Sequence, residues 1–201
     1  MQRILRFSYY FLASISVIVT VFFSNAQIMN YGSYGYYINI EATTLVDFYN
    51  STNGNGWIND NLWGGASGTE CDWYGVTCTS GEITSLSLSS NNLTGSLPMG
   101  LSDLNLLTYI DFSGNSLNGT IPTEFRNLRS LLSFDLSSNE LSGSIPAGLG
   151  DLTSLTNLDL SGNQFSGSIP SELGDLTSLT SLYLHNNQLT SSIPTELGNL
   201  T

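Results

Sequence analysis

Apolar residues recur with a period of 24 along the second half of the chain. One unit has seven apolar positions: Leu131, Phe134, Leu136, Leu141, Ile145, Leu149 and Leu152. Phe134 and Leu136 alternate with polar residues, and this period of two predicts a short, half-buried strand. Ile145 precedes a proline and marks a second extended segment. Leu149 and Leu152, three residues apart, indicate one turn of irregular or 3₁₀ helix.

An asparagine and a proline occupy fixed places in each unit. The asparagines are Asn91, Asn115, Asn139, Asn163 and Asn187, and the prolines are Pro98, Pro122, Pro146, Pro170 and Pro194. Glycine keeps the same register at Gly95, Gly119, Gly143 and Gly167, whereas Ser191 replaces it in the fifth unit. We expect each asparagine to turn inward and to bond backbone groups of the next coil, because a buried amide needs partners.

A single unit cannot be stable alone, because fixing its backbone costs more free energy than burying its few apolar side chains gains. Neighbouring units must therefore stack around a shared core. A period of this length with the pattern L-x-L-x-x-N-x-L is typical of a leucine-rich-repeat solenoid. The predicted fold is an α/β solenoid: a right-handed coil with a parallel β-sheet on its concave face, second short strands and 3₁₀ or irregular turns elsewhere, and a helical N-terminal cap.

The segment before the repeats has the features of a cap. Ala42, Leu45, Val46 and Tyr49 have the spacing of an amphipathic helix, which predicts a helix over residues 41–50. We expect the tryptophans that follow to cover the open end of the leucine core, because a solenoid needs polar caps for solubility. The tyrosine- and glycine-rich residues 27–40 are interpreted as a linker.

The repeat unit L-x-x-L-x-L-S-x-N-x-L-S-G-x-I-P-x-x-L-G-x-L resembles the plant-type subclass of leucine-rich repeats, which includes polygalacturonase-inhibiting proteins and receptor-kinase ectodomains. The segment from Cys71 to Cys78 resembles the N-terminal cap motif of that subclass, C-x-W-x-G-V-x-C. The resemblance covers residues 41–201 and gives a cap over 41–82 and five repeats over 83–201. Secreted bacterial and algal proteins have similar caps and repeats, and the chain is interpreted as one of these.

Residues 1–26 have the features of a secretory signal peptide, with two arginines, an apolar run from Phe7 to Phe23, and small residues before Gln27. A membrane anchor is the alternative, although seventeen residues is at the short limit for a span. Export favours a disulfide between Cys71 and Cys78, the only two cysteines, over a free thiol or a metal role. The expected location is outside the cell or on its surface.

The register of the repeat places the next leucine two positions after Thr201. A C-terminal cap is therefore expected to be missing from this sequence. We interpret the chain as a fragment of a longer protein, or as one whose end is covered by a partner or a second copy.

Charge and composition exclude several classes of function. The 201 residues include 16 acidic residues, four arginines, no lysine and one histidine, with a net charge of −12. This balance excludes nucleic-acid binding through phosphate contacts and opposes docking on an anionic membrane. The usual groups of acid–base and Schiff-base catalysis are nearly absent. We predict no enzymatic activity and no cofactor; membrane association would require a retained N-terminal segment or an anchor in a missing C-terminal region.

The outward side chains of the strands are expected to stack into columns on the concave face. One column contains three carboxylates, and tyrosine or histidine interrupts the serine and aspartate background elsewhere. Exposed aromatic residues often anchor partners. The predicted ligand-binding residues are Tyr109, Asp111, Asp135, Asn157, Asp159, Tyr183 and His185. The alternatives for the carboxylates are a solvated ladder of repeat residues and a calcium site; a catalytic pair is disfavoured because a flat ladder lacks two unlike environments.

A second ladder of hydroxyl groups precedes each Ile-Pro or Leu-Pro pair: Ser96, Thr120, Ser144, Ser168 and Ser192. Regular hydroxyls on a flat surface are a feature of secreted ice-binding proteins. We predict a secreted or cell-surface, non-catalytic recognition module that binds a protein, peptide or glycan on its concave face. The alternative is an ice-binding or structural repeat protein that uses the second ladder. An inhibitor of polysaccharide-degrading enzymes is a narrower form of the first prediction, implied by the resemblance.

Overall fold

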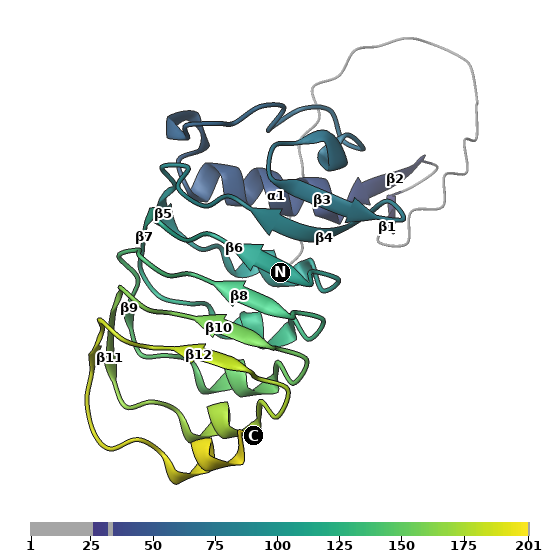
Figure 1. Cartoon of the computed structure of the whole chain (residues 1–201). Coiled ribbons are helices and arrows are strands. Elements are labelled where there is room, and N and C mark those ends of the chain that lie inside the picture. Colours follow the sequence, from purple (N-terminus) through teal and green to yellow (C-terminus); the bar gives the residue numbers. More distant parts are fainter. Residues whose placement is uncertain (1–25, 32–33, 201) are drawn as a thin grey trace.

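The computed structural model describes residues 26–31 and 34–200, and these form the predicted solenoid (Figure 1). One six-stranded sheet runs the length of the stack in the order β12-β10-β8-β6-β4-β3. Its strands are β3 (Val76–Thr79), β4 (Glu82–Ser87), β6 (Tyr109–Asp111), β8 (Ser133–Asp135), β10 (Asn157–Asp159) and β12 (Ser181–Tyr183). All neighbours are parallel except β3, which pairs antiparallel with β4 at the N-terminal end.

The strands of this sheet pair with a register of 24 residues, which is the sequence period itself. Ser85 lies beside Tyr109, Tyr109 beside Ser133, and Ser133 beside Asn157. Equivalent residues of successive coils are therefore direct neighbours, and the columns predicted from the sequence exist on this face.

The repeated asparagines link each coil to the one before it. The side-chain amide of Asn139 donates to the carbonyls of Phe112 at 2.9 Å and Leu136 at 3.1 Å. Its Oδ1 accepts from the backbone N–H of Leu117 at 3.0 Å. Asn115, Asn163 and Asn187 make equivalent bonds. The predicted inward orientation of the asparagines is confirmed. The prediction that their partners lie in the next coil was wrong. The partners lie in the preceding coil and in the same coil, because the side chain points back toward the cap.

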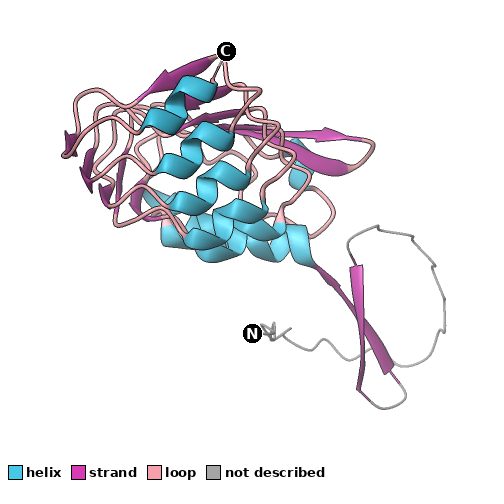
Figure 2. Cartoon of the chain, turned by 90° about the horizontal axis from the view of Figure 1, so that it is seen from below, coloured by secondary structure: helices cyan, strands magenta, loops and turns pink. Residues whose placement is uncertain are grey.

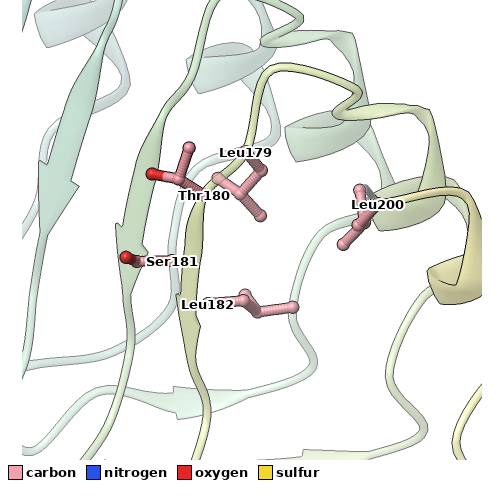
Figure 3. A pocket seen from close by; sticks show the side chains of 5 residues that line it. All are labelled: Leu179, Thr180, Ser181, Leu182 and Leu200. Atoms are coloured by element: carbon pink, nitrogen blue, oxygen red, sulfur yellow. The ribbon is translucent and has the colours of Figure 1, made fainter.

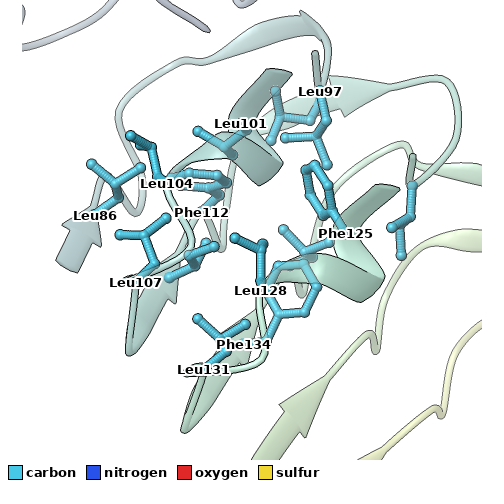
Figure 4. Close-up of a cluster of buried hydrophobic side chains, with 14 of the residues drawn as sticks. Leu86, Leu97, Leu101, Leu104, Leu107, Phe112, Phe125, Leu128, Leu131 and Phe134 are labelled. Atoms are coloured by element: carbon cyan, nitrogen blue, oxygen red, sulfur yellow. The ribbon is translucent and has the colours of Figure 1, made fainter. Parts of the chain in front are cut away.

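A row of 3₁₀ turns forms the side opposite the sheet (Figure 2). The turns are η3 (Met99–Asp103), η4 (Thr123–Asn127), η5 (Ala147–Asp151), η6 (Ser171–Asp175) and η7 (Thr195–Asn199). Each begins after the repeated proline, whose extended conformation starts the turn. Leucine and phenylalanine side chains fill the space between turns and strands, as the coils around Phe112 and Phe134 show (Figure 4).

The second short strands form two smaller sheets, β5-β7 and β13-β11-β9. They are β5 (Thr94–Ser96), β7 (Ser116–Asn118), β9 (Ser142–Gly143), β11 (Gln164–Gly167) and β13 (Gln188–Leu189). Their register is 22 residues rather than 24: Ser96 pairs with Asn118, and Ser142 with Gln164. The pairing thus steps back by two residues in each coil relative to the sequence period.

The cap segment packs on the first coils. Helix α1 (Ile40–Ser51) begins at Asn39, whose Oδ1 accepts from the Ala42 N–H at 3.1 Å, and two short turns follow, η1 (Gly54–Gly56) and η2 (Glu70–Asp72). Phe48 of α1 stacks on Phe112 of the second repeat with ring centroids 4.9 Å apart. The three tryptophans, Trp57, Trp63 and Trp73, are buried. The predicted disulfide between Cys71 and Cys78 is present, with Cα atoms 5.5 Å apart.

Residues 27–40 differ from the predicted linker. They contribute to an antiparallel pair of strands, β1 (Ala26–Tyr31) and β2 (Tyr34–Asn39), before α1 begins at Ile40. Tyrosine and isoleucine favour extended backbone, and their abundance here outweighs the glycines on which the linker interpretation rested. The predicted signal peptide, apart from Ala26, lies outside the described residues.

The last coil has an open apolar edge. Leu182, Leu184, Leu189 and Leu197 are half-buried there. Leu182 and Leu200 line a shallow pocket with three neighbouring residues (Figure 3). Within residues 26–31 and 34–200, none of the helices has the length and apolar character needed to cross a membrane.

Candidate functional site

The concave face brings together six of the seven predicted ligand-binding residues. Tyr109 and Asp111 lie on β6, Asp135 on β8, Asn157 and Asp159 on β10, and Tyr183 on β12. Asp111, Asp135, Asp159 and Tyr183 are successive neighbours in one column. The seventh residue, His185, lies two residues beyond the end of β12 and packs edge-on against Tyr183, with ring centroids 6.3 Å apart.

Serine side chains and backbone amides fix one oxygen of each carboxylate. Oδ1 of Asp111 accepts from the N–H of Ser113 at 3.0 Å and from its hydroxyl at 2.6 Å. Ser161 contacts Asp159 in the same way, at 2.9 and 2.6 Å. These serines thus position the aspartates, and Ser161 is only 7% exposed. The hydroxyls of Ser113 and Ser161, two residues after their aspartates, are therefore occupied by contacts within the protein.

Asp135, at the centre of the carboxylate column, has a raised pKa. Partial burial raises the pKa of Asp135, and repulsion from Asp159 and Asp111 raises it further, while hydrogen bonds from Ser137 act in the opposite direction. Partial burial also raises the pKa of Tyr109, as do the charges of Asp111 and Asp135. The ion pair of Arg126 with Asp151, at 2.6 Å, joins η4 to η5 and so lies outside this face.

One residue of this face was not predicted from the sequence. Leu132, immediately before β8, is 47% exposed. The equivalent residues of the other coils are Thr84, Thr108, Thr156 and Thr180. This threonine background was a usable signal, but Leu132 follows the buried Leu131 and was not considered in the sequence analysis.

The second ladder is exposed but not arranged as predicted. Ser96, Thr120, Ser144, Ser168 and Ser192 are all exposed. However, the strand register pairs Ser96 with Asn118, two residues before Thr120. Two residues of strand span about 6.6 Å, so successive hydroxyls of the ladder are offset along the strand direction rather than directly opposite one another.

The described residues contain no group of three or more histidine, cysteine, aspartate or glutamate side chains that could hold a metal ion. Each carboxylate of the column accepts a hydrogen bond from the backbone N–H of the serine two residues later.

Three family models match the repeats. "Leucine Rich Repeat" matches residues 82–104 and 106–128, "Leucine rich repeat" matches 119–165, and "Leucine Rich repeats (2 copies)" matches 153–199. The Arabidopsis thaliana leucine-rich repeat receptor protein kinase EMS1 is 38% identical over 98 residues, which are 48% of this chain and 8% of that protein. The chain thus spans less than a tenth of this relative, and the kinase in its name refers to another domain.

Solved structures match over a larger share of the chain. The BIR3–SERK2 complex from Arabidopsis thaliana matches with a TM-score of 0.66 and 35% identity, covering 77% of this chain and 87% of that chain. A plant ice-binding protein matches with a TM-score of 0.73 and 36% identity, covering 81% of this chain and 53% of that one. The ectodomain of the Arabidopsis receptor kinase HAESA, in complex with an IDA peptide hormone, matches with a TM-score of 0.58 and 33% identity. This match covers 81% of this chain and 32% of that chain.

These relatives are plant proteins, and the bacterial or algal origin stays a prediction. The solenoid fold, the asparagine-anchored coils and the matches over most of the chain agree with one another. The chain belongs to the plant-type leucine-rich repeat family.

Proposed function

We propose that the chain is a secreted or cell-surface recognition module without catalytic activity, and that it binds an extracellular polypeptide on its concave face. The observation that carries this proposal is the 24-residue register of the main sheet, which gathers two exposed tyrosines and three carboxylates on one open face. Exposed aromatic residues are frequent anchors of protein interfaces.

The relatives support a polypeptide ligand over a glycan. One related structure is a complex between two proteins, and another contains a receptor ectodomain with a peptide hormone. An inhibitor of polysaccharide-degrading enzymes would be a special case of the same function, because its ligand is also a protein.

Selection from a random peptide library tests this function. Peptides enriched on the purified protein should bind the wild type but not Asn157→Arg, which places a bulky cation at the centre of the concave face. Gln164→Arg places the same side chain on β11, one of the second short strands outside the main sheet, and this variant should leave binding intact. Failure to enrich any peptide, or equal binding to both variants, would contradict the proposal.

Ice binding is the second candidate, favoured by the likeness to a plant ice-binding protein and by the exposure of the whole second ladder. Inhibition of ice recrystallisation would support it if Thr120→Tyr abolished the effect and Thr123→Tyr, on η4, did not. Absence of inhibition in the wild type would remove this candidate. The offset between ladder residues already argues for the concave face as the functional surface.

A further inference from the structure

Leu132 and Tyr109 both depart from the repeat and lie in adjacent coils. The backbone N–H of Leu132 donates to the carbonyl of Thr108 at 2.8 Å, so Leu132 lies beside the residue that precedes Tyr109. Leu132 is 47% and Tyr109 is 39% exposed. We call these two residues the anchor patch.

The fold does not need a leucine at position 132. In the column of Leu132, each threonine hydroxyl donates to a backbone carbonyl of the neighbouring strand: Thr84 to Thr77, Thr108 to Thr84, Thr156 to Leu132, and Thr180 to Thr156. Leu132 cannot make this bond and exposes an apolar side chain instead. Tyr109 likewise stands in a column that otherwise holds Ser85, Ser133, Asn157 and Ser181. Exposed apolar and aromatic side chains that folding does not require are frequent anchors of a partner.

The anchor patch adjoins two carboxylates on neighbouring strands. Asp111 lies two residues after Tyr109 on the same strand and beside Asp135. Oδ1 of each is engaged by Ser113 or Ser137. Oδ2 of Asp111 has a 3.5 Å contact from the Tyr109 hydroxyl.

From these neighbours we infer that the concave face binds a polypeptide segment with an apolar residue and an arginine two positions apart, the apolar residue on the anchor patch and the arginine across Asp111 and Asp135. This inference rests on the proposed recognition function and specifies its ligand. Alternate residues of an extended segment lie about 6.6 Å apart on one face, which matches the spacing from Tyr109 to Asp111.

Charge and geometry favour arginine over lysine. Adjacent strands lie about 4.8 Å apart, and the planar guanidinium has five N–H donors that can bridge two carboxylates at once. Between residues 34 and 200 the chain has only two arginines, Arg126 and Arg129, and neither belongs to the strands of this face. The strands of this face thus contribute no arginine or lysine of their own to pair with these carboxylates.

The test combines peptide selection with affinity measurements by isothermal titration calorimetry. Random heptapeptides enriched on the purified protein should carry an apolar residue and an arginine two positions apart. For one such synthetic peptide, Leu132→Thr and Tyr109→Ser should each weaken binding at least tenfold, and so should Arg→Gln in the peptide. Met99→Thr removes an exposed apolar side chain from η3 and should change affinity less than twofold.

The outcomes separate this inference from the proposed function. Enriched peptides without arginine, or an unchanged affinity of the Leu132→Thr variant, would overturn the inference. The proposed function would still stand if Asn157→Arg abolished binding, because that result places the binding site on the concave face. Binding that survives Asn157→Arg, or selective binding of glycans instead of peptides, would overturn both.

Discussion

Asn139 accepts a hydrogen bond at 3.0 Å from the backbone N–H of Leu117, a residue of the preceding coil. Asn139→Ala leaves this buried N–H without a partner, and the carbonyls of Phe112 and Leu136 also lose their side-chain donor. An unsatisfied buried group costs about 1–3 kcal/mol, so we expect the free energy of unfolding in urea to fall by about 2–4 kcal/mol.

The matched control for Asn139 is Asn118→Ala. Asn118 is an exposed asparagine of β7, and its replacement should change the free energy of unfolding by less than about 0.5 kcal/mol. Equal losses in the two variants would mean that the inward asparagines do not link the coils.

Ser191 should be a local weak point of the fifth repeat. Its φ is 69°, close to those of Gly95, Gly119, Gly143 and Gly167, which lie between 77° and 85°. Left-handed backbone costs a residue with a Cβ about 1–2 kcal/mol, partly offset by the greater flexibility of glycine in the unfolded chain. Ser191→Gly should therefore raise the free energy of unfolding by about 0.5–1 kcal/mol. The neighbouring Ser192→Gly should give no such gain; a larger gain there would contradict this explanation.

Leu132→Thr should stabilise the fold while it weakens ligand binding. The new hydroxyl can donate to the Thr108 carbonyl, as Thr156 does to Leu132 at 2.8 Å. A hydrogen bond of this kind contributes about 0.5–1.5 kcal/mol, and the midpoint of thermal unfolding should rise accordingly. A drop in the midpoint would show that Leu132 serves the fold, and its role in the anchor patch would lose its support.

Asp135 should give stability a characteristic pH dependence. Burial and its neighbours raise the pKa of Asp135 in the folded state. The folded state thus holds the proton more tightly than the unfolded chain, and the contribution of Asp135 to stability falls as pH rises from about 3.9, the ordinary value, through the raised pKa. Asp135→Asn removes this loss. In urea unfolding, the free energy of unfolding of the variant should rise relative to that of the wild type as pH rises from 3 to 7. A difference between the two free energies that stays constant with pH would contradict the raised pKa of Asp135.

The sequence was sufficient for the features that repeat with period 24. The alternation around Phe134 predicted the main sheet. The inward asparagines predicted the stacking of coils around a shared core, and the prolines before each turn predicted the 3₁₀ row. The columns containing Tyr109 and Asp135 followed because the register of the main sheet equals the sequence period.

Features that depend on the path of the backbone were not predictable from the repeat. The second short strands pair with a register of 22 residues, as Ser96 does with Asn118, and no side-chain pattern in the 24-residue repeat encodes this shift. The strands at residues 26–31 and 34–39 precede the repeats and have no period. Leu132 was overlooked because a leucine next to Leu131 resembles the repeat, and its exposure becomes clear only in the structure.

The most direct test of a concave recognition surface is backbone amide NMR of the isotope-labelled protein, titrated with an enriched arginine-containing peptide. The largest chemical-shift changes should fall at residues 108–111 and 132–135, with smaller ones at Asn157–Asp159 and none along η3 to η7. Largest changes in the second layer, at Thr94–Ser96 and Ser116–Asn118, or in the 3₁₀ row, would contradict the account.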